Sequence, residues 1–188
     1  ETINSALVNL SRRVQANFVT LLNLDGTVFA GSSILDSQAE LVLRNLVVKV
    51  DRGSEPAAWS ATRAFGGKLY EIVFVPFLAP DLVKWTAVGF EIDAQLARSF
   101  KTISGTDLIF SLKEGTARRA FASSLEEGTT AQVMRELGID GERRWIAAEG
   151  RRYYFADSET LDGATIVVLK DASLQMKLLE RTELICMA

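Results

Sequence analysis

Residues 87–96 read Ala87-Val88-Gly89-Phe90-Glu91-Ile92-Asp93-Ala94-Gln95-Leu96, and this stretch decides the fold of the chain. Its first half is mostly apolar and β-prone, which predicts a strand. Asp93 follows in the place of an N-cap residue, and an amphipathic helix pattern begins after it. The same succession returns at Val167-Val168-Leu169-Lys170-Asp171-Ala172-Ser173-Leu174. A strand that ends at a helix-capping aspartate twice in one chain predicts an internal repeat.

Further pairs of stretches match in the same order along the chain. They are Leu21 to Thr27 with Ile109 to Thr116, Ala30 to Ser33 with Phe121 to Ser124, and Ala64 to Tyr70 with Ala147 to Tyr153. The separation between partners shrinks along the chain, from Gly26 and Gly115 through Gly67 and Gly150 to Asp93 and Asp171. We therefore predict a structural duplication whose second copy has a shorter helix and shorter loops.

Hydrophobic periodicity predicts the elements of the first copy. The apolar residues Ile3, Leu7, Leu10 and Val14 are spaced as in a heptad helix. β-prone runs at 18–22 and 27–30 flank Asp25-Gly26, which is a hairpin turn signal. A helix over 37–50 and three strands, at 59–65, 69–78 and 82–92, complete this copy. A hairpin, a helix and a three-stranded meander together form a five-stranded antiparallel sheet with a helix on one face.

These elements place the chain in the α+β class, as two tandem PAS-like modules with flanking helices on a long N-terminal helix. The expected parts are a helix at 1–16, a first module at 17–93, a connecting helix at 94–104 that Gly105 ends, a second module at 105–171 and a C-terminal helix at 172–188. The short helix of the second module is expected at 130–137. Each sheet leaves room for a cavity between its concave face and its short helix.

The composition excludes several classes of function. Because there is no histidine, the chain has no Ser-His-Asp triad and no histidine-based metal site. The one cysteine, Cys186, allows no intramolecular disulfide and no thiolate zinc site. The net charge is −3 and the arginine pairs are scattered, so nucleic acid is not an expected partner. No pattern brings two carboxylates together for hydrolysis. We predict no enzymatic activity, no cofactor and no metal site.

Two stretches also carry a resemblance to a known family. One runs from Val88-Gly89-Phe90-Glu91-Ile92-Asp93-Ala94-Gln95-Leu96-Ala97 on to Ser104-Gly105-Thr106-Asp107-Leu108-Ile109-Phe110, and the other is Ile166 to Leu174. With its helices and two PAS-like modules, the chain resembles the double Cache sensor domains of bacterial diguanylate cyclases, phosphodiesterases and histidine kinases. The resemblance implies a periplasmic domain, a homodimer and signal transmission through the terminal helices. It implies no catalysis in this region.

The resemblance does not extend to one ligand motif of that family. Its amino-acid-binding branch has a Tyr, Arg, Trp-Tyr and Asp pattern in the first module. The matching region here reads Trp59-Ser60-Ala61-Thr62-Arg63-Ala64-Phe65, without the full pattern. Amino-acid binding is therefore not an expectation for this chain.

We predict the periplasmic sensor domain of an inner-membrane signalling receptor. It would bind an unidentified small molecule and relay a conformational change to a cytoplasmic output domain, as in cyclic di-GMP signalling. The alternative is a module without a small ligand that spaces or dimerises the receptor or binds another protein. Membrane spans are expected outside these 188 residues. The apolar Leu184 to Ala188 is either the start of such a span or the end of an amphipathic helix.

The terminal helices are the expected output path and dimer contact. The first helix presents Ile3, Leu7, Leu10 and Val14 on one side, and the last presents Leu174, Leu178 and Ile185 near one face. Both helices lie at the ends of the chain, where membrane spans would attach in a receptor. The other interpretation is that these side chains only complete the cores of the two modules.

Alternation along the strands of the first module predicts a ligand site. The candidate ligand-binding residues share one sheet face: Trp59, Arg63, Phe65, Tyr70, Phe74 and Trp85. Arg63 among these aromatic rings would bind a carboxylate or phosphate. Alternatively, it lies at the sheet edge and its aliphatic stem covers apolar surface. In the second module, Trp145, Tyr153 and Phe155 are candidates for a smaller pocket.

Overall fold

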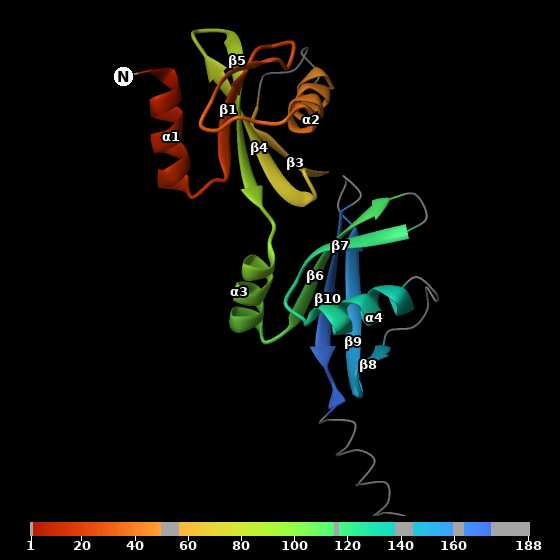
Figure 1. Cartoon of the computed structure of the whole chain (residues 1–188). Coiled ribbons are helices and arrows are strands. Elements are labelled where there is room, and N and C mark those ends of the chain that lie inside the picture. The colour runs from red at the N-terminus through yellow and green to blue at the C-terminus, as the bar shows by residue number, and fades with distance from the viewer. Residues whose placement is uncertain (1, 50–56, 115–116, 138–144, 160–163, 174–188) are drawn as a thin grey trace, which may run out of the picture. The chain divides into compact units, whose positions relative to one another are not determined.

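The computed structural model describes residues 2–49, 57–114, 117–137, 145–159 and 164–173, and these form two compact units that divide between Ile92 and Asp93 (Figure 1). Each unit contains one five-stranded antiparallel sheet with helices beside it. The predicted α+β class and the two tandem PAS-like modules are therefore confirmed. The helix that was expected to connect the modules belongs to the second unit.

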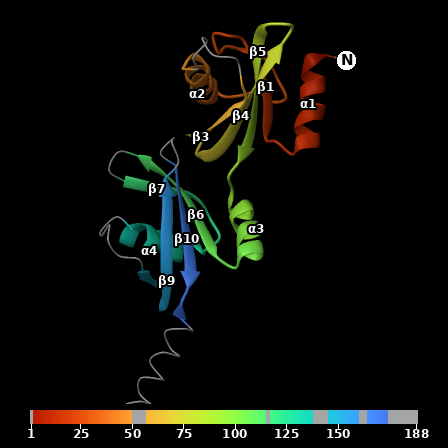
Figure 2. The same ribbon diagram turned by 180° about the vertical axis from the view of Figure 1, so that it is seen from behind.

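The first unit follows the predicted order of elements closely. Its elements are α1 (Ile3–Val14), β1 (Phe18–Leu22), β2 (Val28–Gly31), α2 (Ser37–Val48), β3 (Trp59–Phe65), β4 (Lys68–Leu78) and β5 (Leu82–Glu91). The strand order across the sheet is β2-β1-β5-β4-β3. Helices α1 and α2 lie on opposite faces of this sheet (Figures 1 and 2). On its face, α1 contacts β1 and β2.

Local chemistry fixes where these elements begin and turn. Asp36 accepts a hydrogen bond from the Ala39 backbone N at 2.7 Å and so caps α2, as an N-cap aspartate does. The β1–β2 turn contains Gly26 at φ +80°, a conformation that glycine adopts without a steric penalty. Beside it, Asp25 accepts from both the backbone N and the hydroxyl of Thr27, and these bonds lower the Asp25 pKa.

The core of the first unit lies between α2 and the sheet. The helix contributes Leu43, Leu46 and Val47, all buried. The facing strands contribute alternate residues, because every second side chain points to the same sheet face. The strand residues are Phe18, Leu22, Ala61, Phe65, Ile72, Phe74, Trp85 and Ala87.

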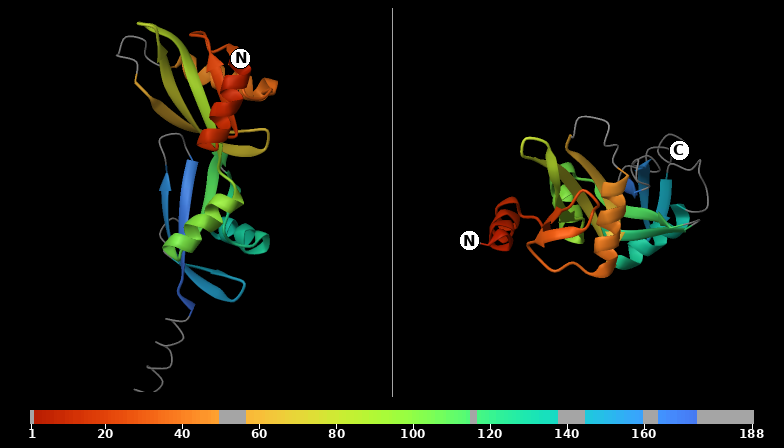
Figure 3. Two further views of the ribbon diagram at one scale, coloured as in Figure 1. Left: turned by 90° about the vertical axis from the view of Figure 1, so that its left-hand side faces the viewer. Right: turned by 90° about the horizontal axis from the view of Figure 1, so that it is seen from above.

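The second unit repeats the architecture of the first (Figure 3). Its elements are α3 (Ala94–Ser104), β6 (Asp107–Glu114), β7 (Ala117–Ser123), α4 (Glu127–Leu137), β8 (Trp145–Ala148), β9 (Arg151–Glu159) and β10 (Ala164–Asp171). The strand order β7-β6-β10-β9-β8 is that of the first sheet, element for element. As predicted, Asp93 caps α3 and Gly105 ends it at φ +65°. Helix α3 contacts β6 and β7 just as α1 contacts β1 and β2.

The duplication extends to individual hydrogen bonds. In the first unit, the Val19 backbone N donates to the Ser32 hydroxyl at 2.8 Å, and the Ser32 backbone N donates to the Val19 carbonyl. In the second unit, Leu108 and Ser124 form the same pair of bonds, each at 3.0 Å. A serine that forms the same pair of hydrogen bonds with the neighbouring strand in both units confirms the predicted internal repeat.

The strand register corrects one matched pair. Val19 pairs with Val88 in the first sheet, and its counterpart Leu108 pairs with Val168 in the second, so Val88 corresponds to Val168. Three residues further along each strand, Asp171 therefore corresponds to Glu91 and not to Asp93. Asp171 is the last residue of β10 and accepts from the Ser173 backbone N at 2.9 Å. The interaction with the Ser173 hydroxyl, followed by this backbone hydrogen bond, lowers the pKa of Asp171. A strand-terminal aspartate and an N-cap aspartate look alike in sequence, because both precede a turn of the chain.

Of the helices among the described residues, none is long and apolar enough to cross a membrane. The predicted output residues Leu174, Leu178 and Ile185, like Cys186 and the apolar stretch at 184–188, lie outside the described part of the chain.

Candidate ligand-binding site

A pocket of about 250 Å³ opens in the first unit between the start of α2, the start of β1 and the β3–β4 hairpin. We call it the α2 pocket. Its lining comes from three segments that are far apart in sequence. They supply Asn17 and Phe18, then Ser33, Ile34, Leu35, Asp36 and Ala39, and finally Phe65, Gly66 and Tyr70.

Three aromatic rings border the α2 pocket. Phe65 and Tyr70 are stacked, with ring centroids 4.4 Å apart and planes at 12°. Phe18 meets the edge of Tyr70 at 5.8 Å and 66°, and lies 6.1 Å from Phe65. Such offset and edge-to-face pairs stabilise each other beyond the area they bury. The rings therefore form a preorganised apolar wall.

Polar groups surround this wall. Asp36 caps α2 at the pocket, and Asn17 accepts a hydrogen bond from the Glu91 backbone N at 2.7 Å through its side-chain oxygen. Burial, followed by the nearby carboxylate of Glu91, raises the pKa of the Tyr70 phenol. The Tyr70 hydroxyl therefore stays protonated at neutral pH, as a donor and acceptor beside an apolar surface.

The two units differ at this place in a way that bears on binding. Helix α2 begins one residue after Asp36 and α4 one residue after Glu126, so Ala39 corresponds to Thr129. The hairpins Phe65–Lys68 and Ala148–Arg151 also correspond, which matches Gly66 with Glu149. In the second unit, the Thr129 hydroxyl donates to Glu149 at 2.8 Å, bridging helix and hairpin. In the first unit the same two positions are Ala39 and Gly66, which have no side chains that could form this bond and which line the α2 pocket. Helix and hairpin are joined there beside the pocket, where the Gly66 backbone N donates to the side-chain oxygen of Gln38 at 3.3 Å.

The loop before the helix also differs between the units. Ser32 and Ser124 are equivalent by their hydrogen bonds, and three residues separate Ser32 from Asp36, whereas Leu125 alone separates Ser124 from Glu126. The longer loop, residues 33–35, lines the α2 pocket. Both changes make room in the first unit.

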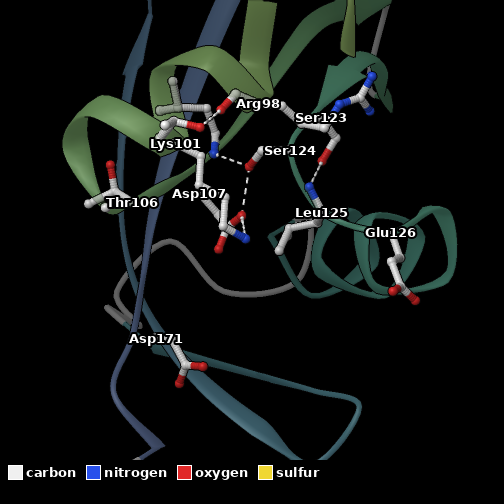
Figure 4. A network of polar contacts seen from close by, with 12 residues as sticks. Arg98, Lys101, Thr106, Asp107, Ser123, Ser124, Leu125, Glu126 and Asp171 are labelled. Carbon is white, nitrogen blue, oxygen red and sulfur yellow. Dashed lines mark hydrogen bonds and ion pairs between the residues drawn. The ribbon is translucent and has the colours of Figure 1, made fainter. Parts of the chain in front are cut away.

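In the second unit, polar contacts hold the corresponding region together (Figure 4). Asp107, at the position of Phe18, is only 7 % exposed. It accepts from the Ser124 hydroxyl at 2.7 Å and forms an ion pair with Lys101 at 2.7 Å. This network ties α3 to the β7–α4 connection, where the first unit has an aromatic ring at a pocket.

The predicted site residues share one sheet face, as expected, but they form two groups. Trp59 stacks on Phe74 with centroids 4.1 Å apart, and Trp85 lies beside them in the core. Phe65 and Tyr70 belong to the α2 pocket. Along β4, the partners of Trp85 and Arg63 are Pro76 and Tyr70, six residues apart, which corresponds to about 20 Å.

Arg63 has contacts of its own. Its guanidinium donates to the carbonyl of the preceding Thr62 at 2.7 Å, and Arg63 is not among the described residues that line the α2 pocket. In the other group, the indole N–H of Trp59 is buried without a hydrogen-bond partner. A buried donor without a hydrogen-bond partner reduces the stability of the fold by about 1–3 kcal/mol. At the Trp59 end of this sheet face, a bound acceptor would remove that cost by accepting from the indole N–H.

A second pocket, of about 210 Å³, lies in the second unit. Trp145 and Tyr153, two of the predicted residues, line it together with Arg152, Tyr154 and Ala172. Phe155 packs against the core of the unit instead. The Arg152 guanidinium lies 5.8 Å from the centre of the Trp145 ring. All of this described lining comes from β8, β9 and the residue after β10, without a wall from α4.

Sequence reasoning missed Phe18, Asp36, Ala39 and Gly66 as lining residues. Ala39 and Gly66 line the pocket because their side chains are small or absent. Phe18 was assigned only to a strand, and Asp36 was given no role. The sequence does contain one sign of the pocket, because the matched hairpins of the two copies have Gly66 in one and Glu149 in the other at the equivalent position. Among the described residues, no group of three or more histidine, cysteine or acidic side chains is arranged to hold a metal ion.

The sequence matches no known protein family profile and no curated protein. Its fold is similar to those of solved sensor domains. One is the periplasmic domain of LuxQ from Vibrio cholerae, with a TM-score of 0.54 and 9% identity over 90% of this chain and 79% of that one. Another is the ligand-binding domain of Mlp24 with asparagine, with a TM-score of 0.52 and 15% identity over 94% and 77%.

A third similar structure is a domain of a sensory box/GGDEF family protein from Vibrio parahaemolyticus, with a TM-score of 0.51 and 12% identity over 90% of this chain and 77% of that one. Two of these structures are thus named as a periplasmic domain and a ligand-binding domain, and the third is a domain of a sensory protein. The chain thus has the tandem PAS-like fold of bacterial extracytoplasmic sensor domains.

Proposed function

We propose that this chain is the periplasmic sensor domain of a membrane-bound bacterial receptor, of the double Cache type, and that it binds a small molecule in the α2 pocket. The observation that carries the proposal is the difference between its two units. The side chains of Thr129 and Glu149 meet between helix and hairpin in the second unit, whereas the equivalent Ala39 and Gly66 line a pocket in the first. Aromatic walls with a few convergent polar groups are typical of small-molecule sites.

Binding there would act on three elements at once, because the lining joins α2, β1 and the β3–β4 hairpin. A ligand that draws these segments together would favour one conformation of the first unit, in proportion to its differential affinity for the two states. The expected output is a cytoplasmic domain such as a diguanylate cyclase or a histidine kinase. The chain itself would not be catalytic.

A thermal-shift screen of metabolites against the purified chain tests this proposal. A ligand at one hundred times its dissociation constant stabilises the folded protein by about 2.7 kcal/mol. Gly66→Glu introduces into the pocket the residue found at the equivalent position, Glu149, which itself adopts φ +47°. This variant should abolish the shift caused by any compound that binds in the pocket.

Gly67→Glu is the matched control. Gly67 lies in the same hairpin at φ +75°, so the backbone strain is comparable, but no atom lies within 4 Å of a Cβ placed there. The control variant should keep the ligand response. Equal loss in both variants, or equal retention, would contradict the assignment of the site.

The second candidate function is a module that dimerises the receptor. Three apolar residues of α1, namely Ile3, Leu10 and Val14, are exposed to solvent, at 51%, 39% and 42%. They favour a contact between two copies, with or without a ligand. A screen without any stabilising compound, together with a dimeric receptor, would support this function alone.

A further inference from the structure

The charge around the α2 pocket is one-sided. Asp36 is the one charged residue among its described lining, and no arginine or lysine is among those residues. An anionic ligand would therefore meet a carboxylate without a compensating cation. The positive end of the α2 dipole does not change this balance, because the Asp36 side chain already occupies the N-cap position.

The two carboxylate oxygens of Asp36 have different surroundings. One oxygen accepts the Ala39 backbone N–H at 2.7 Å. The other lies toward Gly66, 3.7 Å from the position that a Cβ on that glycine would take. Since both Ala39 and Gly66 line the pocket, the second oxygen faces the open space and can accept from a bound donor.

Lys68, a basic residue near Tyr70, does not offset the charge of Asp36. Lys68 forms an ion pair with Glu91 at 2.8 Å, so its charge is compensated by that carboxylate. Glu91 lies near Tyr70, where it contributes to the raised pKa of the phenol. Asp36, Glu91 and Lys68 all act on the Tyr70 phenol, and Arg63 is the strand partner of Tyr70 on β3. Among these charged groups, Asp36 alone belongs to the described lining of the pocket.

The aromatic wall adds a second attraction for cations. The faces of aromatic rings are electron-rich, and a cation within about 6 Å of a ring centre is attracted by the quadrupole. Phe18, Phe65 and Tyr70 all border the pocket that contains the Asp36 oxygen. A carboxylate beside aromatic rings selects a positively charged group with an apolar body.

We infer that the α2 pocket takes a small organic cation, an amine whose ammonium group binds Asp36 and whose apolar part packs against Phe18, Phe65 and Tyr70. This inference rests on the proposed function of the pocket and names the chemical class of its ligand. It differs from the sequence-based expectation of a carboxylate or phosphate bound by Arg63, which donates to the Thr62 carbonyl.

Three probes of the same shape and different charge test the inference: benzylamine, benzyl alcohol and benzoate. Each is titrated into the isotope-labelled chain at neutral pH, and amide shifts of Ala39 and Gly66 are followed by NMR. Benzylamine should bind about fivefold tighter than benzyl alcohol, and benzoate should bind most weakly.

Asp36→Asn removes the charge and keeps the N-cap, because asparagine caps helices as well as aspartate does. In this variant the affinity for benzylamine should fall to that for benzyl alcohol. Asp93→Asn, at the cap of α3 in the other unit, is the matched control and should change neither affinity.

The possible results separate the inference from the function on which it rests. Benzoate binding at the pocket as tightly as benzylamine, or an unchanged preference in Asp36→Asn, overturns the cationic ligand class and leaves the pocket as a site. If none of the probes shifts Ala39 or Gly66, or if the shifts lie in the second unit, the α2 pocket is not the binding site and both statements fall.

Discussion

The ring of Phe18 lies directly against Gly89, its partner on the neighbouring strand, so that a Cβ on Gly89 would overlap the ring. In the second unit, the equivalent pair is Asp107 and Leu169. The first unit thus has the large Phe18 opposite a glycine, and the second has the smaller, polar Asp107 opposite a leucine. Gly89 is needed for space at this position, and it fixes the ring that borders the α2 pocket.

Gly89→Ala should therefore destabilise the protein by about 1–3 kcal/mol, because the added methyl group displaces the Phe18 ring. In a Phe18→Leu background, where the ring is absent, the same substitution should cost little or nothing. Urea unfolding of the four proteins of this double-mutant cycle measures the coupling. An equal cost of Gly89→Ala in both backgrounds would mean that the ring does not impose the glycine.

Two buried threonines of the first sheet should respond in opposite directions to replacement by valine. The Thr20 hydroxyl is fully buried and has no hydrogen-bond partner, so Thr20→Val should stabilise the fold by about 1 kcal/mol. The Thr62 hydroxyl donates to Glu71 at 2.7 Å, so Thr62→Val should destabilise it by about 1 kcal/mol. Denaturant unfolding distinguishes the signs, and a loss of stability in both variants would contradict this account of Thr20.

The buried carboxylate of the second unit should matter more for stability than an exposed one. Asp107→Ala removes the acceptor of Ser124 and the partner of Lys101, and should cost about 1–3 kcal/mol. The lost ion pair contributes only a small part of this cost, because Lys101 is 47% exposed and remains solvated.

Asp157→Ala is the control for this comparison. Asp157 pairs with Arg118 at 3.2 Å on the surface, and its loss should cost less than about 0.5 kcal/mol. Both free energies of unfolding come from the same urea titrations. Similar costs for the two substitutions would show that the Asp107 network does not contribute as proposed.

The exposed side of α1 predicts a pattern of crosslinks between subunits of the full receptor. Single cysteines at Ile3, Leu10 or Val14, in a Cys186→Ser background, should form disulfides between copies, and ligand should change their yield. Leu7→Cys should not, because Leu7 is buried in its own unit. Crosslinking that is absent at all four positions, in a receptor that still signals, would exclude α1 as the dimer contact.

Much of the fold was predictable because the signals are local. The β3–β4 turn, between the strands predicted at 59–65 and 69–78, and the α3 boundaries at Asp93 and Gly105 depend on the chemistry of neighbouring residues, and the structure has them as predicted. Asp171 was misaligned by two residues, since only the pairing of β10 with β6 shows its register.

The candidate site was less predictable. Alternation placed Arg63 and Trp85 on one face correctly, but their distance along the sheet depends on register between strands. The α2 pocket is lined by Ala39 and Gly66, whose contribution is the space that they leave. A pattern of large or charged side chains does not reveal such positions, whereas comparison of the two copies does.

Hydrogen–deuterium exchange, with and without a compound identified by the thermal-shift screen, tests the central claim most directly. The two units provide an internal control, because peptides covering 33–39 and 65–70 in the first unit correspond to those covering 125–129 and 148–153 in the second. The account predicts that the ligand slows exchange in the first pair of peptides and leaves the second pair unchanged. Protection confined to the second unit, or unchanged exchange around α2 and the β3–β4 hairpin of a stabilised protein, would contradict it.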